Sequence, residues 1–202
     1  MAVKPLDERQ LFRMKRENLE KRINLYYLET HDTDTVLEYS LAVLVFNGIT
    51  IDDYSFVCKD LIKEIFLTNE PSDKLRDYCL YFYDFFEYEE WERVRDRLFK
   101  NRAAFSEHTR AIRPETKYVR AESAPTAETT ESSEDYFETV FMDELGKKHK
   151  QRFRNVDVDM PNKKLFTLLR ILTKLTIFEK DGVRRFTQVV PADCKTIIAD
   201  TF

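Results

Sequence analysis

The chain has 202 residues, of which 43% are hydrophobic and 35% are charged, enough to build one large core or two small ones. Its 3 glycines and 6 prolines are too few for an all-β sandwich or barrel, so a mainly α-helical fold is expected. The longest apolar run, Leu41 to Phe46, is too short to span a membrane, and the charged residues 1–16 lack the apolar stretch of a signal peptide. We therefore expect an intracellular protein, cytoplasmic or nuclear, that does not engage a membrane.

The sequence changes character twice, which predicts two folded modules joined by a tether. Residues 1–105 have the pattern of a bundle of helical hairpins, and residues 106–134 are rich in Ser, Thr, Glu and Ala. Residues 135–202 form a small segment of mixed α+β pattern. Lys and Arg number 16 against 21 Asp and Glu in the first part, 4 against 6 in the second and 13 against 10 in the third. An acidic first module and a basic last module favour different partners.

Apolar spacing and capping residues predict five helices in the first module. The first covers residues 6–29. The second follows a capping pair, Thr35 with Glu38, and ends at Asn47 and Gly48. A third helix begins near Thr50. A fourth is capped by Ser72, and a fifth follows a turn over residues 87–90.

The segment from Phe82 to Trp91, an aromatic helix end followed by an acidic turn, resembles the turn of a tetratricopeptide hairpin. Trp91 stands where that family has a small residue, and no internal repeat of that family's length recurs in the chain. An ordinary five-helix bundle is therefore the preferred architecture, with a helical-repeat bundle as the alternative.

Residues 106–134 contain no large apolar side chain after Val119. Such a composition buries too little surface to offset the entropy of ordering, so a disordered, flexible linker is predicted.

The C-terminal segment is expected to contain, in order, a helix over residues 135–149, a strand over 152–160, a helix over 163–176 and a β-hairpin. The hairpin turn is Asp181-Gly182, because Asp-Gly accommodates positive φ. This order resembles an abbreviated winged-helix module that lacks one of the usual helices.

A basic run in this segment is the strongest candidate for nucleic-acid binding. It comprises Lys147, Lys148, Lys150, Arg152 and Arg154, and Arg184 and Arg185 follow at the hairpin tip. These side chains could neutralise phosphates of RNA or DNA, or they could simply be the solvated end of a helix.

Aromatic residues crowd the segment from Tyr78 to Trp91. A helix in a thin bundle cannot bury rings on every side, so some of them are expected to face a partner. The candidates are Tyr81, Tyr83, Tyr88 and Trp91. The alternative is that the rings fill the core.

No catalytic, metal-binding or cofactor-binding motif is present in the sequence, and the three cysteines are expected to be free thiols. The sequence therefore favours a non-enzymatic adaptor that binds a protein through its helical module and a second partner through its C-terminal module. The alternative is a nucleic-acid-binding regulator in which the basic module holds RNA or DNA and the helical module drives homodimerisation or recruitment.

Overall fold

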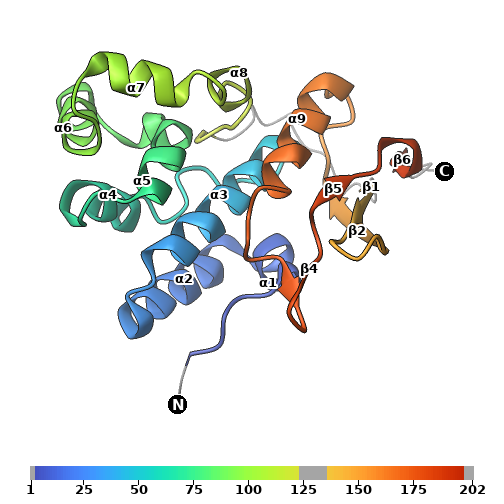
Figure 1. Cartoon of the computed structure of the whole chain (residues 1–202). Helices are drawn as coiled ribbons and strands as arrows, with labels where there is room; N and C mark the ends of the chain where they lie inside the picture. The colour runs from blue at the N-terminus through green and yellow to red at the C-terminus, as the bar shows by residue number, and fades with distance from the viewer. Residues whose placement is uncertain (1–2, 123–135, 198–202) are drawn as a thin grey trace.

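The computed structural model describes residues 3–122 and 136–197 (Figure 1). As predicted, an N-terminal helical region, residues 8–116, precedes an α+β region with an antiparallel sheet. No helix within the described ranges has both the length and the apolar character that a membrane span requires. The helices of the first region are α1 (Glu8–Arg13), α2 (Arg16–Thr30), α3 (Thr33–Ile49), α4 (Lys59–Thr68), α5 (Asp73–Tyr78), the 3-10 helix η1 (Cys79–Phe85), α6 (Tyr88–Leu98), α7 (Arg102–Thr109) and α8 (Arg113–Thr116).

α3 lies at the centre of the molecule (Figure 1), and every residue from Val36 to Ile49 is buried. Its sequence is apolar on nearly all sides, which is typical of a fully buried helix. The predicted cap at Thr35 is wrong, because Asp32 caps the helix and accepts a hydrogen bond from the Thr35 backbone N–H at 3.0 Å. The predicted end at Gly48 is also wrong. This residue stays helical, and a Cβ there would lie 3.2 Å from Leu168 Cδ1, so glycine permits the close packing.

Two other predicted helices have different boundaries in the structure. The helix predicted over residues 6–29 divides into α1 and α2, because Met14 is extended at φ −77° and ψ 139°. The third predicted helix begins only at Lys59. The preceding residues cannot be helical, because Phe56 and Cys58 have positive φ values of 47° and 52°.

One predicted boundary agrees with the structure and a second agrees in part. Ser72 caps α5, and its Oγ accepts a hydrogen bond from the Leu75 backbone N–H at 3.1 Å. The turn predicted over residues 87–90 is confirmed only at Glu87, because α6 already begins at Tyr88; the Glu87 backbone N–H donates to Glu90 Oε2 at 3.0 Å in a capping box.

The linker predicted over residues 106–134 is wrong in its first half. α7 continues to Thr109, α8 follows, and both Val119 and Ala121 are buried. The Asn47 side-chain amide donates to the backbone carbonyl oxygens on either side of Ala121, at 3.1 and 3.0 Å. The second half of that prediction, residues 123–134, lies outside the described residues.

The α+β region is built around one strand, β1, which pairs antiparallel with β2, β5 and β6. Because β2 pairs with β1 alone in the described sheet, it forms an edge. A separate short hairpin joins β3 to β4. The elements are β1 (Tyr136–Met142), β2 (Lys148–Arg154), α9 (Asn162–Leu172), β3 (Glu179–Lys180), β4 (Val183–Arg184), β5 (Gln188–Val189), the 3-10 helix η2 (Pro191–Asp193) and β6 (Lys195–Ile197).

The helix predicted over residues 135–149 is wrong, because this segment forms β1, a turn and the start of β2. β1 is rich in aromatic and β-branched residues, which suit a strand. Gly146, at φ 80°, lies in the turn, a conformation that favours glycine. The winged-helix resemblance depended on that helix and is lost with it. The predicted hairpin is confirmed, with Asp181 and Gly182 both at positive φ.

The two regions share one hydrophobic core among the described residues. The ring of Phe153, from β2, lies 5.3 Å from that of Phe12 and 6.2 Å from that of Phe46, both in the helical region. A β-bridge between Thr50 and Val156 adds backbone pairing. We therefore expect one cooperative folding unit. Independent folding of modules 1–105 and 135–202 stays a prediction from sequence that this packing does not favour.

Candidate functional site

The basic run lies on one exposed face of edge strand β2. Lys148, Lys150, Arg152 and Arg154 alternate with residues that face the interior, of which Phe153 is fully buried. The sequence predicted the run itself but placed part of it at a helix end. A strand, unlike a helix, directs every second side chain to the same side, so four cations form a row.

Two carboxylates partly neutralise this row. Glu138 is only 2% exposed, and it contacts Lys150 at 3.1 Å, Arg152 at 3.0 Å and Lys195 at 3.8 Å. Hydrogen bonds from Arg152 and Lys150 hold the pKa of Glu138 below its usual range. Lys148 contacts Asp193 at 2.6 Å. The cations still outnumber these carboxylates, so the face keeps an excess of positive charge.

Lys147 lies in the turn before β2 and is exposed. Asp143 fixes this turn by accepting hydrogen bonds from the backbone N–H groups of Lys147 and Leu145, at 2.8 and 2.9 Å, and contacts His149 Nε2 at 2.7 Å. The hydrogen bond with His149 lowers the pKa of Asp143. The turn therefore presents Lys147 from a fixed backbone beside the row.

The two hairpin arginines do not join this face. Arg184 donates from Nη2 to the carbonyl oxygens of Thr173 and Leu175, at 3.0 and 3.3 Å, just beyond the end of α9. Arg185 pairs with Glu8 at 2.6 Å. Both side chains are partly buried, so they hold the fold together and do not form the tip of a phosphate-binding wing.

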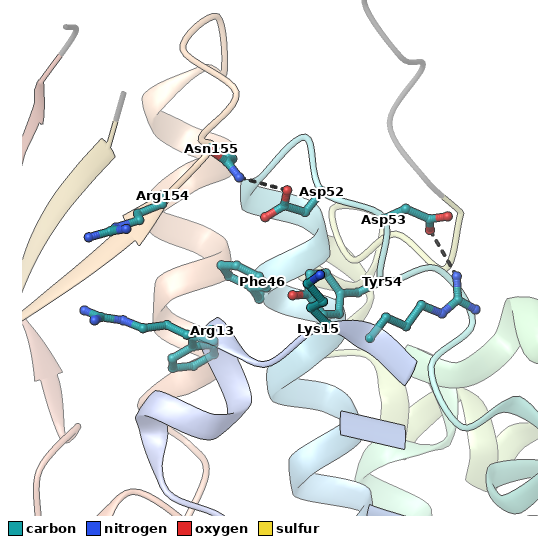
Figure 2. Close-up of a pocket in the computed structure, with 10 residues that line it drawn as sticks. Arg13, Lys15, Phe46, Asp52, Asp53, Tyr54, Arg154 and Asn155 are labelled. Atoms are coloured by element: carbon teal, nitrogen blue, oxygen red, sulfur yellow. Dashed lines mark hydrogen bonds and ion pairs between the residues drawn. The ribbon is translucent and has the colours of Figure 1, made fainter. Parts of the chain in front are cut away.

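A cavity of about 410 Å³ lies beside Arg154, between the α1–α2 junction, the loop after α3 and the end of β2 (Figure 2). We call it the basic pocket. Four cations and two carboxylates line it, together with an amide and three rings that are largely buried. The lining residues are Phe12, Arg13, Lys15, Arg16, Phe46, Asp52, Asp53, Tyr54, Arg154 and Asn155.

The carboxylates of the basic pocket already have partners. Asp53 contacts Arg16 at 3.3 Å, and Asp52 accepts a hydrogen bond from Asn155 Nδ2 at 3.0 Å. Burial raises the pKa of Asp52. Sequence reasoning missed this pocket, although Arg13, Lys15 and Arg16 are nearly consecutive. A continuous helix would have directed them to different sides.

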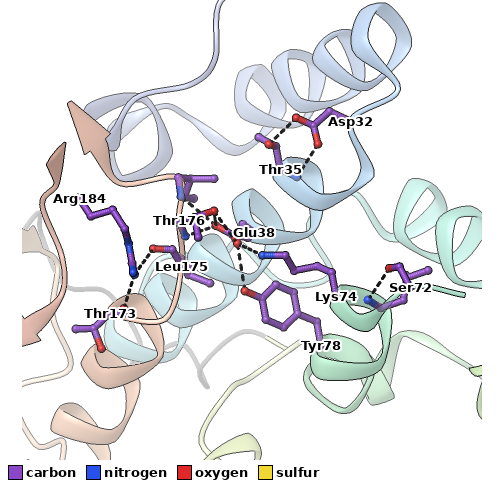
Figure 3. A network of polar contacts seen from close by, with 12 residues as sticks. Asp32, Thr35, Glu38, Ser72, Lys74, Tyr78, Thr173, Leu175, Thr176 and Arg184 are labelled. Atoms are coloured by element: carbon purple, nitrogen blue, oxygen red, sulfur yellow. Dashed lines mark hydrogen bonds and ion pairs between the residues drawn. The ribbon is translucent and has the colours of Figure 1, made fainter. Parts of the chain in front are cut away.

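A second polar cluster surrounds Glu38, a buried carboxylate of α3 (Figure 3). It accepts hydrogen bonds from Lys74 and from Tyr78, the latter at 3.3 Å. It also accepts from the Thr176 hydroxyl at 3.0 Å and from the Ile177 backbone N–H at 3.0 Å. The cluster joins α3, α5 and the segment after α9, so its hydrogen bonds link the two regions of the fold.

The four aromatic candidates separate into two groups. Tyr81 and Trp91 are each 6% exposed, so they belong to the core and cannot form an accessible surface. Trp91 packs against Phe86 and Phe105. Tyr83 and Tyr88 are exposed by 45% and 69%. The rings available to a partner are therefore Tyr83 and Tyr88.

Matched Tyr→Phe substitutions should separate a core tyrosine from a surface tyrosine. Tyr81 donates its hydroxyl to Glu115, so Tyr81→Phe should lower the free energy of unfolding by about 1–3 kcal/mol, because Glu115 loses a buried partner. Tyr88→Phe should change it by less than about 0.5 kcal/mol. Urea denaturation followed by circular dichroism measures both. Equal effects would contradict the difference in burial.

The described residues contain neither a metal-binding cluster nor an accessible thiol at Cys58 or Cys79. No group of three or more His, Cys, Asp or Glu side chains within residues 3–122 and 136–197 could hold a metal ion. Cys58 and Cys79 are free and buried, as the sequence predicted, and burial raises the pKa of each thiol to about 12.

Comparison with known proteins identifies no relative: no family model, curated protein or solved structure matches this chain.

Proposed function

We propose that this chain is a non-enzymatic adaptor with two binding surfaces, one for nucleic acid and one for a protein. The observation that carries the proposal is the row of Lys148, Lys150, Arg152 and Arg154 on one exposed face of an edge strand. Alternate residues on a strand repeat at about 7 Å. Evenly spaced cations of this kind suit an extended phosphate backbone, and such contacts position a protein without reading bases.

The internal ion pairs of this face do not oppose the proposal. Glu138 is shared among three cations, and Lys148 is paired with an Asp193 side chain that is itself partly exposed. An incoming phosphate can therefore replace part of each contact. Arg154 has no ion pair with any described residue, so we expect it to contribute most.

Titration of fluorescent single-stranded RNA and DNA with the full chain at several salt concentrations tests this surface. Replacing Lys148 or Arg154 with Gln should weaken binding similarly across sequences, and each should reduce the salt slope by about one unit. Lys100→Gln is the control, because Lys100 is exposed on the helical region. Absence of binding at low salt would exclude nucleic acid as the second partner.

The second surface surrounds Tyr83 and Tyr88 on the helical region. Asp84, Glu87 and Glu89 are exposed beside these rings. Exposed tyrosines flanked by carboxylates favour a protein segment that carries Lys or Arg, because the rings accept cations and the carboxylates attract them. This is the protein-binding surface of the proposed adaptor.

Cross-linking in lysate, with and without nuclease, tests the protein-binding surface. A protein partner should remain bound after nuclease treatment, and Tyr83→Ala or Tyr88→Ala should weaken its binding by about 1–3 kcal/mol each. The melting temperature should stay nearly unchanged for Tyr88→Ala, whose ring is 69% exposed, whereas Tyr83 also contacts the buried ring of Trp91. A partner that is lost with nuclease, or that ignores both substitutions, would contradict this surface.

A further inference from the structure

The basic pocket holds cations that the fold does not neutralise. The side chains of Arg13, Lys15 and Arg154 have no hydrogen bond or ion pair to any residue in the described ranges, whereas Arg16 is paired with Asp53. Figure 2 shows the Arg13 and Arg154 side chains running in the same direction from α1 and from β2. Both side chains are exposed and carry charge that no described carboxylate neutralises, so an anion bound between or beside them would be attracted by both.

Hydrogen bonds fix the backbone around this pocket. Tyr54 donates its hydroxyl to the Met14 carbonyl oxygen at 2.9 Å, which holds the α1–α2 junction. The Ile51 backbone N–H donates to the Asn155 carbonyl oxygen at 2.8 Å, and the Asn155 side chain donates to Asp52. Arg13 and Arg154 therefore project from anchored segments, although they are far apart in the sequence.

The N-terminus of α2 reaches the same pocket. No side chain among the described residues caps this helix of 15 residues, and Lys15 and Arg16 stand at its first positions. Its first backbone N–H groups are therefore donors without an intrahelical acceptor, and the helix dipole favours negative charge there. This supplements the arginines, which are the independent evidence for an anion.

The remaining walls indicate which anion fits. Phe12, Phe46 and Tyr54 are buried, so they form an apolar floor and offer no ring face on which a base could stack. Four cations against two partnered carboxylates leave a formal excess of two positive charges. Two arginines and free helix N–H groups match the several acceptor oxygens of a phosphate dianion.

We infer that the basic pocket binds the phosphate group of a phosphomonoester, held by Arg13 and Arg154 with Lys15 at its edge. The group could belong to a free mononucleotide or to the phosphorylated end of a nucleic-acid strand, since both present the same dianion. This site shares Arg154 with the row on β2, but it does not require that the row bind a polymer.

Isothermal titration of the full chain, supported by NMR of the arginine Nε–Hε groups, tests the inference. The probes are inorganic phosphate, uridine 5′-monophosphate, uridine, and single-stranded oligonucleotides with and without a 5′-phosphate. Saturable binding is expected for both phosphates and not for uridine. If the 5′-phosphorylated oligonucleotide binds more tightly than its unphosphorylated form, the ligand is a strand end. If the two oligonucleotides bind equally, the ligand is the phosphate of a free mononucleotide.

Variants connect the binding to the pocket. Arg13→Gln and Arg154→Gln should each weaken phosphate binding by about tenfold, and the double variant should abolish saturation. Lys15→Gln is a further test if either arginine variant fails to fold. Arg93→Gln, an exposed change on α6, and Lys148→Gln, on the β2 row, should leave phosphate binding unchanged.

Absence of saturable binding by inorganic phosphate and by the monophosphate would overturn the inference, as would equal affinity in the Arg13, Arg154 and Arg93 variants. Failure of the nucleic-acid proposal has a different result. In that case unphosphorylated oligonucleotides do not bind and Lys148→Gln has no effect on any titration, while phosphate still saturates the pocket.

Discussion

Glu38→Ala is expected to lower the free energy of unfolding by about 3–5 kcal/mol, because removing one member of a buried charged network leaves its partners unsatisfied. Lys74 and Tyr78 would lose their shared acceptor. Thr176 and the Ile177 backbone N–H would lose theirs on the other side of the interface. Urea denaturation followed by circular dichroism measures the effect.

The controls separate charge from connectivity. Asp34→Ala, one turn earlier on α3 and exposed, should change stability by less than about 0.5 kcal/mol. Glu38→Gln keeps the shape of the side chain and one oxygen that can still accept hydrogen bonds. Its effect on the free energy of unfolding should therefore lie between those of Glu38→Ala and Asp34→Ala. A change below about 1 kcal/mol for Glu38→Ala would show that the cluster does not link the two regions.

The sequence predicted the boundaries that depend on neighbouring residues. Ser72 accepts a hydrogen bond from a residue three positions later, so the local sequence contains the whole signal; the capping box of Glu87 is equally local, but the predicted turn does not rest on it. The predicted cap at Thr35 is wrong because Asp32, just before it, caps the helix instead. The predicted helix end at Gly48 is wrong because this glycine stays helical and packs closely against Leu168. Contacts far along the chain decide such positions.

The strand β1 shows why periodicity alone was misleading. Phe137, Val140 and Phe141 are spaced as on one face of a helix, but Phe137 and Phe141 face the shared core from a strand. Val140 is buried but lies outside that core cluster, on the opposite side of the sheet. Because both faces of β1 are buried, the spacing of its apolar residues also fits one face of a helix.

The start of the predicted linker is wrong because composition does not report contacts with distant residues. Its composition is poor in apolar residues, yet Val119 and Ala121 are buried. The Phe56 backbone N–H donates to the Ala121 carbonyl oxygen at 2.7 Å, and Asn47 binds the carbonyls on either side. Hydrogen bonds to distant residues order this segment, and composition does not report them.

The candidate site was predictable only in part. Residues 147–154 are a visible basic run, and the structure places most of their charges on one face. The basic pocket joins Arg13 to Arg154, which no local pattern brings together. The sequence also predicts that Arg184 lies on the same surface as this basic run. In the structure its side chain donates instead to carbonyl oxygens near the end of α9.

Phe153→Ala is expected to lower the free energy of unfolding by about 3–5 kcal/mol, because it leaves a cavity where a fully buried ring was packed. Phe153 contacts Phe12 and Phe46 across the interface between the regions. Val158→Ala, an exposed change in the same region, is the control and should have an effect below about 0.5 kcal/mol.

The same variant decides between one folding unit and two. Trp91 is the single tryptophan of the chain and lies in the helical region, so its fluorescence reports on the region that does not contain the substitution. In one cooperative unit, Phe153→Ala shifts the Trp91 fluorescence transition and the circular dichroism transition to the same lower urea concentration. If Trp91 fluorescence keeps its original midpoint, the helical region folds independently, as the sequence alone had suggested, and the shared core adds no cooperativity.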